Sequence, residues 1–184
     1  MEQLAIPQPP VKTRITVMQG QAHVSDEADV ELSTVLGSCV ASCLFDPVAR
    51  LGGMNHFLLP EPPASRAGYG VDVHYGTYLM EVLINAMLAR GGSKARMKAH
   101  LYGGANLYPG MKPIGSANAD FARQFLHREG IPLVRADLGG VLARRVDFRP
   151  ASGRVRCRQV EAAAAPDNVP IPRAPSTAGD VELF

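Results

Sequence analysis

The chain has 184 residues, of which 46% are hydrophobic and 20% are charged, and its formal net charge is +2. These values are typical of one globular domain with a hydrophobic core, and they do not indicate a nucleic-acid-binding protein. The sequence has no run of about eighteen apolar residues that would cross a membrane, and the N-terminus lacks the order of a secretion signal. We therefore expect a cytoplasmic protein that does not insert into a membrane.

Regular structure is predicted for residues 13–160, as a single catalytic domain. Residues 1–12 contain Pro7, Pro9 and Pro10 and lack a periodic apolar pattern, so they are expected to be disordered. Residues 161–184 contain an alanine run and further prolines, and we expect a disordered tail there too.

The first half of the domain reads as strands. Residues 14–20 and residues 28–35 have extended, β-branched patterns, and Gly37 allows a sharp bend after the second of them. Residues 39–46 and 52–60 then form a predicted hairpin around Asp46-Pro47, a typical turn opener. A polar loop is expected at residues 61–70.

The hairpin brings a cysteine towards a histidine. If Pro47 and Val48 are the central turn residues, antiparallel pairing puts Cys39 directly opposite His56, with their Cβ atoms about 5 Å apart. A longer turn through Arg50 would shift the register.

Two amphipathic helices and further strands complete the fold. The helices are predicted at residues 72–90, with Asp72 as N-cap, and from residue 116 or 117 to 129. Strands are predicted at residues 97–102, 131–134, 141–148 and 155–160, with a turn at 103–106 whose amides are expected to be accessible. The fold class is therefore α+β, an α/β sandwich in which a mixed, largely antiparallel sheet packs against the two helices.

The three cysteines are expected to be free thiols. Their number is odd, and Cys39 and Cys43 would lie about 13 Å apart along one strand, too far to share a disulfide or a zinc ion. Cys39 follows the Gly37 bend, where backbone N–H groups can stabilise a thiolate and an oxyanion. Cys43 and Cys157 are interpreted as packing residues.

His56 is the candidate base, because it alone of the five histidines lies in an apolar stretch. A catalytic imidazole is commonly oriented by a third group, and the hydroxyl of either Ser33 or Thr34 can serve. The residues alone leave that choice open.

Several ordered motifs resemble the CheD family of chemoreceptor glutamine deamidases, over most of residues 13–160. The motifs are Leu36-Gly37-Ser38-Cys39-Val40-Ala41 with Asp46-Pro47, Gly52-Gly53-Met54-Asn55-His56 with Leu59-Pro60, Gly103-Gly104-Ala105-Asn106, Ile114-Gly115 with Asn118, Gly130-Ile131-Pro132, and Asp137-Leu138-Gly139-Gly140.

The resemblance implies a sandwich similar to the deamidating domain of cytotoxic necrotizing toxins and a Cys-His-Thr catalytic set, without metal or cofactor. Cys39 falls on the nucleophile and His56 on the base. The family's threonine, six residues before the cysteine, falls on Ser33, which is a departure. The implied partners are the cytoplasmic helices of methyl-accepting chemotaxis receptors and, as in some relatives, the phosphatase CheC.

Two other classes of function remain as alternatives. One is a mainly non-catalytic adaptor that binds chemoreceptors or CheC. The other is a different Cys-His hydrolase, a receptor methylesterase or a peptidase, because thioester chemistry serves esters and amides alike.

Overall fold

A computed structural model describes residues 9–59, 73–108, 110 and 112–160. The predicted tail, the loop at 61–70 and the N-cap Asp72 lie outside the described residues. Among the described residues, regular elements begin at Thr13 and end at Val160. No helix in this part of the chain is both long and apolar enough to cross a bilayer.

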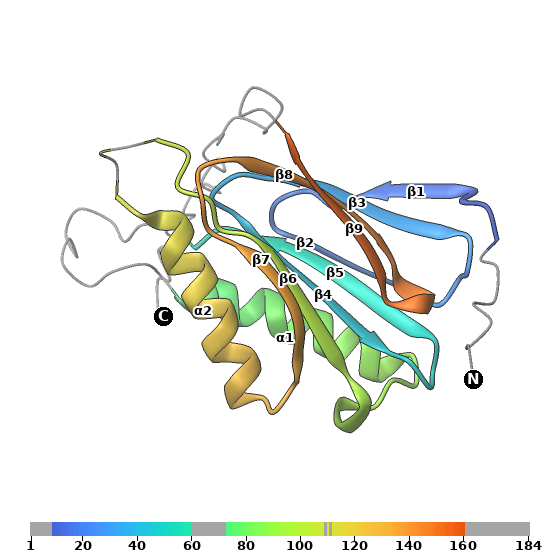
Figure 1. Cartoon of the computed structure of the whole chain (residues 1–184). Coiled ribbons are helices and arrows are strands. Elements are labelled where there is room, and N and C mark those ends of the chain that lie inside the picture. Colours follow the sequence, from blue (N-terminus) through green and yellow to red (C-terminus); the bar gives the residue numbers. More distant parts are fainter. Residues whose placement is uncertain (1–8, 60–72, 109, 111, 161–184) are drawn as a thin grey trace, which may run out of the picture.

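The strands form two packed sheets, where the sequence predicted one (Figure 1). The four-stranded sheet has, in spatial order, β1 (Thr13–Thr16), β3 (Val30–Leu36), β8 (Ala143–Arg149) and β9 (Arg154–Val160). The five-stranded sheet has β2 (Gln21–Ser25), β5 (Leu51–Phe57), β4 (Val40–Asp46), β6 (Lys98–Gly103) and β7 (Leu133–Leu138). The β1–β3 and β6–β7 pairs are parallel and the others antiparallel, so the mixed, largely antiparallel character is confirmed.

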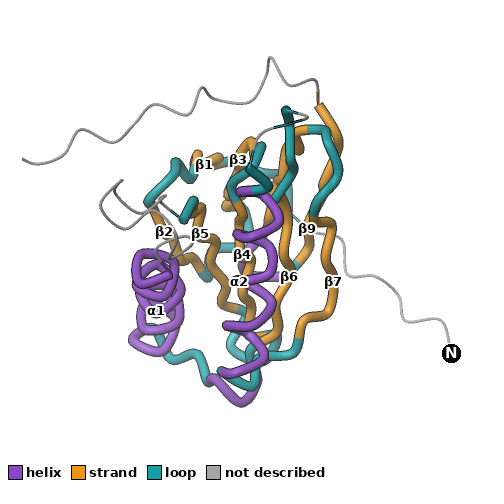
Figure 2. The backbone as a smooth tube through the Cα atoms, turned by 90° about the vertical axis from the view of Figure 1, so that its left-hand side faces the viewer, coloured by secondary structure: helices purple, strands orange, loops and turns teal. Residues whose placement is uncertain are grey.

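Both helices lie on the outer side of the five-stranded sheet (Figure 2). They are α1 (Val73–Ala89) and α2 (Ile114–Arg128), close to their predicted bounds. Two short 3₁₀ turns are present: η2 (Lys94–Arg96) lies between α1 and β6, and η3 (Pro150–Ser152) lies between β8 and β9. The element that the sequence did not reveal is β2, which contains His23 and pairs with β5.

Strand β4 separates the two cores of the molecule. Val40 and Leu44 point into the core under the helices, whereas Ala41 and Cys43 point into the core between the sheets. This alternation follows from the period of two along a strand, and burial on both faces explains the nearly continuous apolar sequence. A side chain on the odd-numbered face of β4 therefore lies between the two sheets.

The register of the β4–β5 hairpin differs from the prediction. Asp46 pairs with Leu51 across a four-residue turn, so the partner of His56 is Ala41 and not Cys39. The Asp46 carboxylate favours the longer turn, because it accepts hydrogen bonds from the amides of Val48 and Ala49. Arg50 completes this turn with a positive φ of 52°.

Candidate active site

Cys39 lies at the end of the bend between β3 and β4, and the backbone of the β6–α2 loop holds this bend. The amide of Gly104 donates to the carbonyl of Cys39 over 2.7 Å, and the amide of Ala105 donates to that of Gly37 over 2.9 Å. Asn106 donates likewise to Gly140. The prediction that these loop amides are accessible was therefore wrong, because they bind neighbouring carbonyls.

Two glycines explain how the loop approaches so closely. A Cβ atom at Gly103, whose φ is +106°, would collide with the carbonyl oxygen of Cys39. A Cβ atom at Gly115 would collide with the carbonyl of Ala105, where α2 begins against the loop. Only glycine permits such contacts between backbones. The β3–β4, β6–α2 and β7–β8 connections consequently gather at one end of the molecule (Figure 1).

Asn118 of α2 joins the cysteine bend to the segment that follows β5. Its side chain is fully buried, its Nδ2 donates to the carbonyl of Ser38 over 2.8 Å, and its Oδ1 accepts from the amide of Leu59 over 2.9 Å. The amide therefore connects the chain just before Cys39 with the chain just after His56. The sequence offered Asn118 as a family motif but no role for it.

The Cys39 thiol is half-buried and lies against the turn between β1 and β2. Its Sγ donates to Oε1 of Gln19 over 3.4 Å, and the side chain packs against the core between the sheets. Burial raises the pKa of Cys39 to about 12, although its own backbone N–H works in the opposite direction. At neutral pH the side chain of Cys39 is therefore a thiol and not a thiolate.

His56 points from β5 into the space between the sheets, where its Nδ1 has two neighbours. Thr34 Oγ1 lies at 2.9 Å and the Val17 carbonyl oxygen at 3.2 Å. Thr34 Oγ1 also donates to that carbonyl oxygen, over 2.9 Å. Because a carbonyl oxygen only accepts, Nδ1 must carry the imidazole proton, and the hydroxyl of Thr34 accepts it.

This tautomer leaves the lone pair on Nε2 of His56. The Nε2 atom is buried and has no hydrogen-bond partner within the described part of the chain. Burial lowers the pKa of His56 to about 4, although the hydrogen bond to Val17 opposes this shift. The imidazole is thus neutral at ordinary pH, with one unpaired nitrogen available as a base.

Ser33, which the family resemblance marked as the third residue, faces the other way. Its hydroxyl donates to Asp147 over 2.8 Å and accepts from Arg145 over 3.3 Å, on the outer face of the four-stranded sheet. Adjacent strand residues point to opposite faces, so only one of Ser33 and Thr34 can reach the imidazole. The structure brings Thr34 to His56.

The cysteine and the histidine lie on the same side of the five-stranded sheet. His56 pairs with Ala41, two residues beyond Cys39, and both Ala41 and the Cys39 side chain contact the core between the sheets. Both residues also bind the β1–β2 turn, Cys39 through Gln19 and the carbonyl of His56 through the amide of Gly20 at 2.8 Å. The β1–β2 turn is the part of the site that sequence reasoning missed.

Other reactive side chains lie away from this arrangement. Cys43 is fully buried in the core between the sheets and Cys157 packs against it, as expected of packing residues. His100 is buried, with Nε2 facing the carbonyl of Gly153 at 3.2 Å. Among the described residues, no three His, Cys, Asp or Glu side chains come together at metal-binding spacing.

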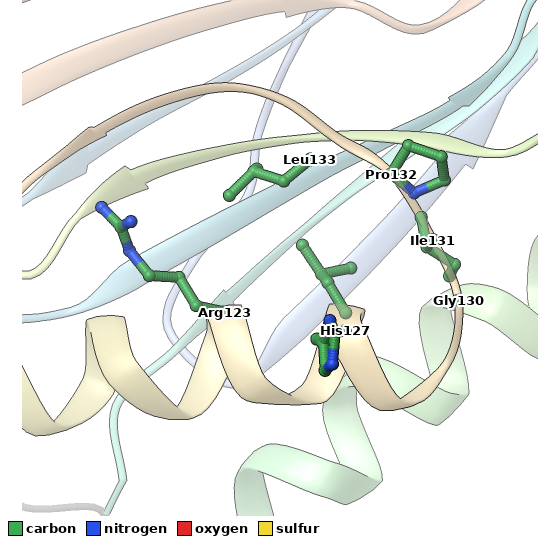
Figure 3. Close-up of a pocket in the computed structure, with 7 residues that line it drawn as sticks. Arg123, His127, Gly130, Ile131, Pro132 and Leu133 are labelled. Carbon is green, nitrogen blue, oxygen red and sulfur yellow. The ribbon is translucent and has the colours of Figure 1, made fainter.

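A surface hollow lies at the far end of α2 from Asn118, between this helix and β7. Figure 3 shows Arg123 and His127 on α2 and Leu133 on the chain that follows it. Among the described residues, none that lines the hollow is a hydrogen-bond partner of the Cys39, His56 or Thr34 side chain. We therefore do not include it in the candidate site.

The Cys39 thiol and the neutral His56 imidazole, both bound to the β1–β2 turn, are the two groups that a cysteine-dependent hydrolase requires. The comparisons with known proteins go further. Residues 58–159 match the family model described as CheD chemotactic sensory transduction, and the chain belongs to the CheD family.

Two relatives carry the name probable chemoreceptor glutamine deamidase CheD. The protein of Zymomonas mobilis subsp. mobilis is 54% identical over 171 residues, which cover 93% of this chain and 92% of that protein. The protein of Caulobacter vibrioides is 49% identical over 182 residues, which cover 97% of this chain and 96% of that protein. The family resemblance drawn from the sequence motifs is thereby confirmed.

Similarity to solved structures is slight. The hypothetical protein YfiH of Bacillus licheniformis has 18% sequence identity and a TM-score of 0.42, with 63% of this chain and 49% of that chain covered. A likeness of this size supports no conclusion about function.

Proposed function

We propose that this protein is a protein-glutamine deamidase, which converts glutamine side chains of chemoreceptors to glutamate and releases ammonia. Membership of the CheD family and the names of its relatives support the reaction and the substrate. The observation that carries the proposal is the state of His56. Its Nδ1 is hydrogen-bonded to Thr34 and Val17, and its Nε2 has no hydrogen-bond partner among the described residues. His56 lies on the side of the sheet where Cys39 packs.

In the first stage, Nε2 of His56 takes the thiol proton while Sγ of Cys39 attacks the side-chain carbonyl carbon of glutamine. The resting pair is neutral, because burial raises the pKa of Cys39 to about 12 and lowers that of His56 to about 4. Proton transfer therefore accompanies the attack and does not precede it. Nearby N–H groups stabilise the oxyanion of the tetrahedral intermediate.

In the second stage the carbon–nitrogen bond breaks. The imidazolium of His56 returns its proton to the departing nitrogen, ammonia leaves, and the acyl group remains on Cys39 as a thioester. Water then attacks the thioester with His56 as base, the carbon–sulfur bond breaks, and glutamate and the free thiol are formed. The cycle balances without a metal or cofactor.

We assign the orienting role to Thr34 and not to Ser33. Thr34 accepts the Nδ1 proton of His56, which fixes the orientation of the ring and leaves the lone pair on Nε2. Ser33 is instead hydrogen-bonded to Asp147. The catalytic set of this proposal is accordingly Cys39, His56 and Thr34. Binding of CheC and a detailed likeness to the toxin deamidase domain remain predictions of the family resemblance.

The test is incubation of the purified protein with a cytoplasmic fragment of a chemoreceptor, followed by mass spectrometry of the receptor glutamines. We expect conversion of the amide to the acid with wild-type protein and a loss of at least about 10⁴-fold for Cys39→Ala. Cys43→Ala removes a thiol of the core and is expected to retain activity. Full activity of Cys39→Ala would refute the proposal.

The released product separates the alternative functions. Deamidation yields ammonia, a methylesterase yields methanol, and a peptidase yields a cut chain. Receptor binding without any product would support the adaptor.

A further inference from the structure

The oxyanion of the proposed reaction needs N–H donors, and several nearby amides are already used. Those of Gly104, Ala105 and Asn106 donate to the carbonyls of Cys39, Gly37 and Gly140. The backbone N–H of Cys39, which lowers the pKa of its own thiol, is one candidate donor. A second donor must lie close to Sγ, because the oxyanion forms only two bonds away from the sulfur.

The Gln19 side chain occupies that position. Its carboxamide oxygen accepts the thiol proton of Cys39 over 3.4 Å, and Gln19 itself is only half-buried. The carboxamide carries two N–H donors next to this oxygen. Rotation about the terminal side-chain bond exchanges the oxygen and the nitrogen at little cost, because this torsion is broad and nearly two-fold.

The turn that carries Gln19 is held rigidly on both sides. The Val17 carbonyl accepts a hydrogen bond from the Thr34 hydroxyl, and the Val17 amide donates to the Ser33 carbonyl over 2.9 Å. On the other side, the Gly20 amide donates to the His56 carbonyl over 2.8 Å. The same strands that position His56 therefore position Gln19 over the nucleophile, and a preorganised donor of this kind is the most effective.

We propose that Gln19 is a further catalytic residue, whose carboxamide turns its N–H group towards Cys39 and stabilises the negative charge that develops on the sulfur and on the oxyanion during the attack. In the resting protein the carboxamide oxygen faces the neutral thiol. When the thiol proton passes to His56, that oxygen would face a negative charge, so the nitrogen takes its place. This assignment rests on the proposed function, because it names the donor for that same reaction.

Kinetics of the full-length chain test the proposal. Gln19→Ala is expected to lower kcat for receptor deamidation by about 100-fold, as for the loss of one oxyanion donor, while KM changes by less than about threefold. Gln19→Glu has the same shape but an ionised carboxylate that only accepts, so its kcat should fall further. The matched control is Gln21→Glu, two residues further on at the start of β2. Its carboxylate can still accept the hydrogen bond of the Met18 amide, as Gln21 Oε1 does.

A second readout does not depend on the receptor. The rate at which iodoacetamide alkylates Cys39, followed on the Cys39 peptide by mass spectrometry, reports thiolate formation as a function of pH. Gln19→Glu is expected to move the midpoint of this profile upward by about one pH unit, because the carboxylate repels the thiolate. Gln21→Glu should leave the midpoint unchanged.

Two results would overturn the role of Gln19. One is wild-type kcat and an unchanged alkylation profile in both Gln19 variants, measured on protein that melts at the wild-type temperature. The other is a lower KM with a higher kcat in Gln19→Ala, which would make the carboxamide a competitor of the substrate. Failure of the wild type to deamidate receptors would instead refute the proposed function, while the alkylation profile would still report on Gln19.

Discussion

The two ends of the β4–β5 hairpin differ in how completely their buried polar groups are hydrogen-bonded. At the turn, the Asp46 carboxylate accepts hydrogen bonds from the amides of Val48, Ala49 and Ser93 and from the Arg96 guanidinium. Burial alone would raise its pKa, but these donors outweigh burial and hold the pKa of Asp46 well below its usual value. At the other end, Nε2 of His56 has no hydrogen-bond partner in the part of the chain that the structure describes.

One hairpin therefore has a buried group that stabilises the fold at its turn, Asp46, and a buried group suited to catalysis at its other end, His56. A buried group with all its partners contributes to the stability of the fold, whereas an unpaired one lowers stability and is available to a substrate. Substitutions at the two ends should therefore affect different measurements.

The largest effect on stability is expected at the turn. Asp46→Ala should lower the free energy of unfolding by about 3–4 kcal/mol, because it leaves Arg96 and three backbone amides without their acceptor. Activity per folded molecule should be unchanged. Denaturant unfolding measures the loss, and Asp26→Ala is the control, since the exposed Asp26–Arg90 pair should contribute less than about 1 kcal/mol. Equal losses in the two variants would contradict the comparison.

At the reactive end, acid should destabilise the fold through His56. The unfolded chain binds this proton near pH 6.5 but the folded chain only near pH 4, so the unfolded state gains protons first as the pH falls. The free energy of unfolding should therefore decrease by about 3 kcal/mol between these pH values. The pKa of His100 is also lowered, chiefly by burial. Protonation of His100 therefore contributes part of the measured dependence of the free energy of unfolding on pH.

The contribution of His56 is isolated by a variant. His56→Gln should show a shallower loss of stability on acidification than the wild type, measured by denaturant unfolding across the same pH series. An identical slope in the variant would show that His56 does not titrate as proposed.

Substitutions of the two neighbouring hydroxyl residues of β3 compare a group that contacts His56 with a group that only stabilises the fold. Thr34→Val removes the acceptor of the His56 Nδ1 proton, and kcat should fall between about 10- and 100-fold. Ser33→Ala is the matched control on the opposite face, expected to cost about 1 kcal/mol of stability and to leave kcat unchanged. The reverse pattern would return the orienting role to Ser33.

A smaller effect is expected at Asn118. In Asn118→Asp the atom that faces the Ser38 carbonyl becomes an acceptor, so the Cys39 bend loses one anchor. Deamidation kcat and the rate of Cys39 alkylation should both fall by about fivefold to tenfold. Asn85→Asp on the exposed face of α1 is the control. A similar fall in kcat and alkylation rate in that variant would show that the effect of Asn118→Asp comes from the added charge alone.

Much of this molecule could be predicted from local patterns in the sequence. The apolar periodicity of α1 and α2 and the alternation of β4 identify these elements with little ambiguity. The sequence identified Cys39 because this reactive residue follows a glycine bend. It identified His56 because this titratable residue lies within an apolar stretch. The structure then places both on the side of the five-stranded sheet that faces the other sheet.

The register and the orienting group could not be predicted in the same way. The hairpin pairing depends on Arg50, a non-glycine residue with a φ of 52°, which sequence patterns disfavour. The choice between Ser33 and Thr34 depends on which face of β3 meets the second sheet, and a shift of one residue reverses it. Gln19 reaches Cys39 only through tertiary packing of a turn, for which local periodicity has no signal.

The carbonyl oxygen of Val17 holds the imidazole proton in place together with Thr34, and it belongs to the backbone. Any amino acid at position 17 would supply the same oxygen, so an alanine scan would pass over this part of the site. What the chain must preserve is the number of residues between β1 and β2. Inserting or deleting one residue there would misalign the base while leaving every side chain of the site intact.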